Sequence, residues 1–85
     1  MKLKHPNAIK LVEVADEYLA RYKKSFADDA DMIECVEKDH ANFISIALLI
    51  EQDEFNNKSI RRAICNLDTC VRDYIPTDIY DLYCG

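Results

Sequence analysis

Glycine is almost absent from this chain, because its only copy is Gly85, the last residue. Glycine is the residue that reaches positive φ without steric cost and lets a backbone lie close to a phosphate. Walker-type loops, dinucleotide-binding turns and two-residue Asn-Gly hairpins are therefore missing from the sequence. The scarcity of glycine favours helices joined by short polar connections.

Apolar side chains recur at steps of three and four residues, which is the period of an amphipathic helix. The pattern predicts helices at about residues 6–24, 29–54, 58–74 and 77–83. Pro6 suits the first turn of the first helix, Asp28 or Asp29 suits the cap of the second, and Pro76 ends the third. The sequence therefore predicts an all-α fold, a small three-helix bundle with a short fourth C-terminal helix, as one domain over residues 1–85.

The second predicted helix needs cover on two sides. Residues 43–50 are uncharged, and at about 100° per residue Ile46 and Leu49 fall opposite the main apolar stripe. Either the fourth helix packs behind this segment, or a second copy of the chain covers Ile46 and Leu49 in a homodimer. Both arrangements bury the second apolar face, so the sequence leaves both open.

Charge is sorted along the chain and not mixed. Residues 1–24 carry +3, residues 25–55 carry −8, residues 56–72 carry +3 and residues 73–85 carry −3, which sums to the formal net charge of −5. The most acidic stretch opens the second predicted helix, where Lys38 is the only cation among Asp28, Asp29, Asp31, Glu34, Glu37 and Asp39. These acids are either a solvated helix start that opposes the helix dipole or a recognition surface.

The acidic stretch leads to our first functional hypothesis. A row of carboxylates can imitate the phosphates of a nucleic acid and occupy a basic groove meant for DNA or RNA. We therefore expect a non-enzymatic protein-binding module, a small acidic inhibitor or regulator of the mobile-element type, that engages a basic, nucleic-acid-handling surface of a larger partner. The expected partner-binding residues are Asp28, Asp29, Asp31, Glu34, Glu37, Asp39, Asp78 and Asp81.

The opposite hypothesis uses the cations of the third predicted helix. Lys58, Arg61, Arg62 and Arg72 gather on its exposed side, after a short polar turn. In this interpretation the chain is a dimeric helix-turn-helix-like DNA-binding protein that reads DNA through the first three of these residues. The isoelectric point of about 4.8 and the intervening Asp68 favour the first hypothesis over this one.

The sequence gives little support for catalysis or for a bound group. Three serines, two histidines and no glycine elbow form no recognisable nucleophile system. Glu37 and His40 spell Glu-x-x-His, which is half of a di-iron site, but no second copy follows. We therefore expect no enzyme activity, no cofactor and no metal, and a histidine packed at the edge of the core.

The sequence also predicts a cytoplasmic protein that does not enter a membrane. Its longest apolar tract is far shorter than the roughly 20 residues that a spanning helix needs. Glu13, Asp16 and Glu17 interrupt the segment that would have to be the apolar part of a signal peptide. The four cysteines are accordingly expected to be reduced.

Overall fold

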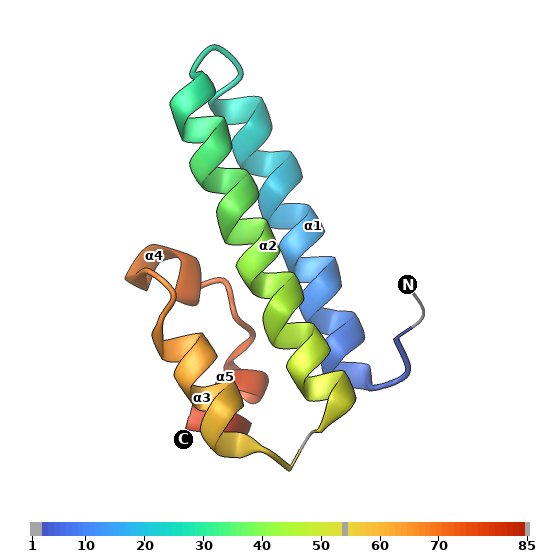
Figure 1. The fold of residues 1–85 in the computed structure, drawn as a ribbon. Helices are drawn as coiled ribbons and strands as arrows, with labels where there is room; N and C mark the ends of the chain where they lie inside the picture. The colour runs from blue at the N-terminus through green and yellow to red at the C-terminus, as the bar shows by residue number, and fades with distance from the viewer. Residues whose placement is uncertain (1–2, 54, 85) are drawn as a thin grey trace.

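The structure is a computed structural model that describes residues 3–53 and 55–84. The described residues form helices joined by short connections (Figure 1). The helices are α1 (Pro6–Ser25), α2 (Ala30–Gln52), α3 (Asn57–Cys65), α4 (Thr69–Arg72) and α5 (Thr77–Cys84). The described ranges contain no strand, and the predicted all-α bundle is confirmed. No described residue has positive φ, in keeping with the scarcity of glycine, the residue that adopts it most readily.

Helices α1, α2 and α5 lie close to their predicted bounds. Asp29 caps α2, because its side chain accepts a hydrogen bond from the backbone N–H of Met32 at 3.1 Å. Pro6 occupies the first helical position of α1, where its missing N–H leaves no bond unmade. Residue 54, the predicted end of the second helix, lies outside the described residues, and α2 ends at Gln52.

The third helix was predicted to run without a break over residues 58–74, and that prediction was wrong. The chain leaves the helix after Cys65 and starts α4 at Thr69. Asp68 is extended, with φ −59° and ψ 150°, which is the conformation of a residue that precedes a helix. The guanidinium of Arg72 donates a hydrogen bond to the carbonyl of Leu67 at 3.2 Å, so a carbonyl freed by the break is satisfied.

A long hairpin of α1 and α2 forms the body of the molecule (Figure 1). The 23 residues of α2 span about 34 Å, which accounts for most of the 41 Å length of the fold. The buried side chains come from every helix and form one continuous core. They are Ala8, Leu11, Ala15, Tyr18, Val36, Phe43, Ile46, Ala47, Ile50, Ile60, Ile64, Leu67, Val71, Ile75, Ile79 and Tyr83.

The second apolar side of α2 is covered within the chain. Helix α3 packs against α2, and α5 packs against α3. Ile46 is 1% exposed and lies beside Ala63 and Leu67, whereas Leu49 is half-buried. Ile46 is therefore buried within one chain, with α3 packed against α2, and it is not available for the predicted homodimer seam.

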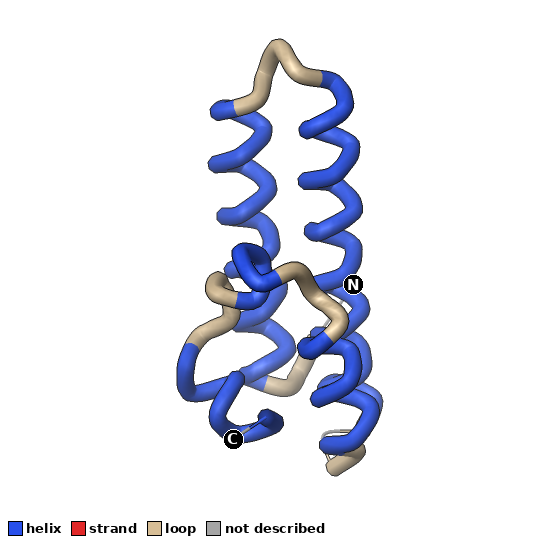
Figure 2. The backbone as a smooth tube through the Cα atoms, turned by 90° about the vertical axis from the view of Figure 1, so that its left-hand side faces the viewer, coloured by secondary structure: helices blue, strands red, loops and turns tan. Residues whose placement is uncertain are grey.

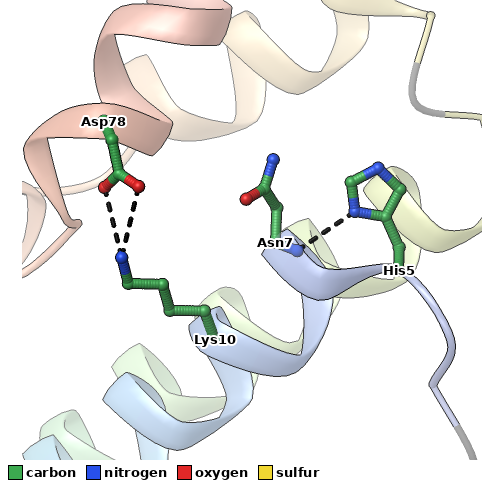
Figure 3. A network of polar contacts seen from close by, with 4 residues as sticks. All are labelled: His5, Asn7, Lys10 and Asp78. Atoms are coloured by element: carbon green, nitrogen blue, oxygen red, sulfur yellow. Dashed lines mark hydrogen bonds and ion pairs between the residues drawn. The ribbon is translucent and has the colours of Figure 1, made fainter.

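Polar contacts fix the start of α1. The Nδ1 atom of His5 accepts a hydrogen bond from the backbone N–H of Asn7 at 3.1 Å and so caps the helix (Figure 3). The carboxylate of Glu51 accepts from the backbone N–H groups of Lys4 and His5. These two hydrogen bonds hold the pKa of Glu51 below its usual range. The end of α2 is thereby tied to the segment that precedes α1.

Candidate functional site

The end of the α1–α2 hairpin extends beyond the other helices. In Figure 1, and again in the perpendicular view of Figure 2, the turn between α1 and α2 lies far from α3 and α5. Residues 23–25 and 27–32, on either side of this turn, are exposed. Six of the eight predicted binding acids lie on this part of the hairpin, between residues 28 and 39.

Four of these six acids are exposed and have no partner among the described residues. Asp28, Asp31, Glu34 and Glu37 are exposed. None of them forms a hydrogen bond or ion pair with another residue in the described ranges 3–53 and 55–84. Asp28 lies in the turn before α2 and the other three lie on α2 itself, and we call the four residues together the acidic face of α2. Asp29, by contrast, uses its side chain to cap the helix.

Asp39 lies in a different environment from the acidic face. It is half-buried, and its Oδ2 atom accepts a hydrogen bond from the hydroxyl of Tyr18 at 2.9 Å. Burial raises the pKa of Tyr18 far above its ordinary value, and the hydrogen bond to Asp39 raises it further. The phenol therefore stays protonated and keeps donating to this carboxylate.

The environment of Tyr18 predicts a loss of stability at alkaline pH. The pKa of Tyr18 in the folded state lies above the unfolded value of about 10. The stability that protonated Tyr18 contributes is therefore complete below about pH 10 and is lost as pH rises through the folded pKa. Stability should fall by up to about 1.4 kcal/mol per pH unit in that window. Urea unfolding of the wild type and of Tyr18→Phe from pH 8 to 11 checks this. If the free energy of unfolding fell equally with pH in the two proteins, the raised pKa of Tyr18 would be contradicted.

The two remaining predicted acids lie at the other end of the molecule. Asp78, on α5, pairs with the ammonium group of Lys10 on α1 at 3.2 Å (Figure 3). The hydrogen bond from Lys10 holds the pKa of Asp78 below its usual range. Asp81 is exposed on the same helix. The structure thus does not bring Asp78 and Asp81 together with the acidic face of α2.

The predicted cationic surface is divided by the break after α3. Lys58, Arg61 and Arg62 are exposed on α3. Arg72 lies on α4, is half-buried, and bonds to the Leu67 carbonyl. The four cations therefore do not lie along one helix.

The hairpin also carries cations that were not predicted as binding residues from the sequence. Arg21, Lys23 and Lys24 are exposed in the last turns of α1, next to the turn that leads to the acidic face. The guanidinium of Arg21 lies 6.0 Å from the centre of the Tyr22 ring. The end of the hairpin is therefore cationic along α1 and anionic along α2.

An aromatic cluster at the hairpin was also missed from the sequence. The ring of Tyr74 packs edge-on against Tyr18, with centroids 5.0 Å apart, and its hydroxyl lies 2.8 Å from that of Tyr22. Tyr22 stacks in turn on Phe26. The spacing of residues 18, 22 and 26 was a signal in the sequence, but their contact with Tyr74 depends on where the break after α3 sends the chain.

Three rings of this cluster, those of Tyr18, Tyr22 and Phe26, line one side of a groove of about 310 Å³. Its walls come from the outer parts of α1 and α2 on one side and from the start of α4 on the other. The lining residues are Tyr18, Tyr22, Phe26, Met32, Cys35, Val36, Asp39, Asp68, Cys70 and Val71. This groove lies on the same half of the hairpin as the acidic face of α2.

His40 pairs with an acid on the neighbouring helix. Its Nε2 atom lies 2.9 Å from Oδ1 of Asp16, which links α2 to α1. Within residues 3–53 and 55–84, no group of three or more His, Cys, Asp or Glu side chains could hold a metal ion. No helix in the described part of the chain is long and apolar enough to cross a membrane.

Comparison with known proteins gives no relative from which a function could be transferred. No protein-family model matches the chain, and no curated protein or solved structure is significantly similar to it. Any functional conclusion therefore depends on the residues and their arrangement.

Proposed function

We propose that this chain is a non-enzymatic protein-binding module whose acidic face of α2 engages a basic surface of a larger, nucleic-acid-handling partner. The observation that carries the proposal is the state of Asp28, Asp31, Glu34 and Glu37, which are exposed and unpaired among the described residues. No cation in the described part of the chain pairs with these carboxylates, so their negative charge can attract a basic surface of another protein.

The position of these acids supports the same proposal. They lie on the half of the hairpin that extends beyond α3 and α5 (Figures 1 and 2), and all four are exposed. Complementary charge raises the association rate and selects the partner. Binding of this kind would occupy a surface that otherwise contacts phosphates, so the module would inhibit or recruit the partner.

Capture from a lysate tests the proposal. Tagged chain is incubated with lysate at low salt, with and without nuclease, and the retained proteins are identified. We expect a basic nucleic-acid-binding protein that stays bound after nuclease treatment and is displaced by a competing DNA or RNA duplex. Retention that disappears with nuclease would show that nucleic acid bridged the two proteins, and would contradict the proposal.

The exposure of Lys58, Arg61 and Arg62 on α3 favours a second candidate, a helix-turn-helix-like DNA-binding protein. With Ile46 already buried within one chain, its dimer would need a seam other than the predicted one. The affinity for DNA would fall steeply with ionic strength and would depend on these three cations. Absence of DNA binding at low salt would eliminate this candidate.

A further inference from the structure

The groove between the hairpin and α4 combines apolar walls with carboxylates. Tyr18, Tyr22, Phe26 and Met32 supply apolar surface, and Met32 is 37% exposed although it is large and apolar. At about 310 Å³ the groove is at the lower end of the range of about 300–1,000 Å³ that is typical of small-molecule sites. A space of this size suits one or two long side chains better than a cofactor.

The two carboxylates of the groove have unused hydrogen-bonding capacity. Asp39 accepts one hydrogen bond, from Tyr18 to Oδ2, and no bond to its Oδ1 atom occurs within the described ranges. Asp68 precedes α4, but its side chain makes no capping hydrogen bond, and it forms no ion pair within residues 3–53 and 55–84. None of the residues that line the groove is a cation. A ligand with a positive charge would therefore find two acceptors and no repulsion from the lining.

Arginine and lysine fit this combination of surfaces. Their aliphatic stems pack along apolar and aromatic surface while the charged group stays near acceptors. An apolar neighbour in the same peptide would cover Met32 and Phe26. We propose that the groove binds a basic segment of a partner protein, with an arginine or lysine held by Asp39 and Asp68 and flanked by an apolar side chain. This inference rests on the proposed function, because it names the feature of the basic partner that the hairpin recognises.

Short peptides test the groove without the partner. The probes are the capped tripeptide leucyl-arginyl-leucine, its citrulline counterpart, which has the same shape but no charge, and glycyl-arginyl-glycine, which lacks the apolar flanks. Binding is followed by backbone NMR shifts and by the alkylation rates of the cysteines. Cys35 and Cys70 line the groove, and the exposed Cys65 at the end of α3 lies outside its lining.

The arginine peptide should bind saturably and slow alkylation of Cys35 and Cys70, while Cys65 reacts at its original rate. The citrulline peptide lacks the positive charge and the glycine peptide lacks the apolar flanks, so each should bind at least about tenfold more weakly. Equal binding of all three peptides, equal protection of Cys65, or no binding at all would overturn the proposal.

Paired variants separate the groove from the rest of the acidic charge. Asp39→Asn keeps an acceptor for Tyr18, and Asp68→Asn keeps a residue that is favoured before a helix, so the fold should be preserved. The double variant should bind the arginine peptide about tenfold more weakly. The control, Glu13→Gln with Glu17→Gln, removes the same charge from exposed positions on α1 and should bind like wild type. Equal affinity of the two double variants for the arginine peptide would contradict the role of Asp39 and Asp68 in the groove.

The outcomes for the groove and for the proposed function remain distinguishable. If no peptide binds but a basic partner is still captured in a nuclease-resistant manner, only the groove proposal fails. If the peptide binds with the expected dependence on Asp39 and Asp68 but no basic partner is retained, the proposed function fails and the groove remains a site for a basic segment.

Discussion

Replacing Phe43 with alanine is expected to lower the free energy of unfolding by about 3–5 kcal/mol. Phe43 is completely buried on α2, and its ring packs edge-on against Tyr18 at a centroid distance of 5.7 Å. Alanine would leave a cavity between the two helices of the hairpin, and a chain of this size has only about 5–15 kcal/mol of stability to lose. Urea unfolding followed by circular dichroism measures the difference.

Phe55→Ala is the matched control for that measurement. Phe55 is 86% exposed, so the same substitution removes the same atoms without opening a cavity. Its effect should stay within about 0.5 kcal/mol. Similar losses in the two variants, or a Phe43→Ala protein as stable as wild type, would contradict the packing of α1 against α2.

Reversing two charges on the acidic face should weaken binding to the captured basic partner on the order of 100-fold, because like charges would then face each other across the interface. The change is Asp31→Lys with Glu34→Lys, and the affinity is measured by calorimetry at low salt. Lysine near the start of α2 costs only about 0.3–1 kcal/mol through the helix dipole, so helicity should be retained.

The control for the reversal is Glu13→Lys with Glu17→Lys. Both double variants bring the formal net charge from −5 to −1, since each substitution adds two positive charges. The control changes the exposed surface of α1 and leaves the acidic face intact. A loss of affinity that is equal in both variants would mean that net charge, and not the acidic face of α2, governs binding.

The parts of the fold that follow from local rules were predictable from the sequence. Helices α1 and α2 have long apolar stripes, and Asp29 is the type of residue that caps a helix. The lack of glycine correctly indicated connections without positive φ. The acidity of the start of α2 was also evident, because charge is a property of the sequence alone.

The break after Cys65 was not predictable from the apolar periodicity of the third predicted helix. Leu67 and Val71 continue the apolar period and both are buried, but Leu67 lies in the connection after α3 and Val71 lies on α4. Asn66 and Asp68 are residues that favour caps and turns, and they carried the missed signal. The groove depends on this break, because α4 supplies one of its walls. The groove therefore could not be predicted from the sequence alone.

The separation of the acids by environment likewise required the structure. In the sequence, Asp39 and Asp78 are equivalent to Asp31. In the fold, Asp39 accepts a hydrogen bond from Tyr18, Asp78 forms an ion pair with Lys10, and Asp31 is unpaired among the described residues. Such differences arise from contacts between helices, which periodicity and charge counts do not specify.

Carboxylate footprinting of the complex with the captured partner shows directly which acids contact the partner. Exposed carboxylates are converted to amides with a carbodiimide and an amine, with and without the partner, and modification is measured by mass spectrometry at each residue. We expect protection of Asp31, Glu34 and Glu37 in the complex, with Glu13 and Asp81 modified at an unchanged rate. Protection of Glu13 or Asp81, with the acidic face of α2 still fully reactive, would contradict this expectation.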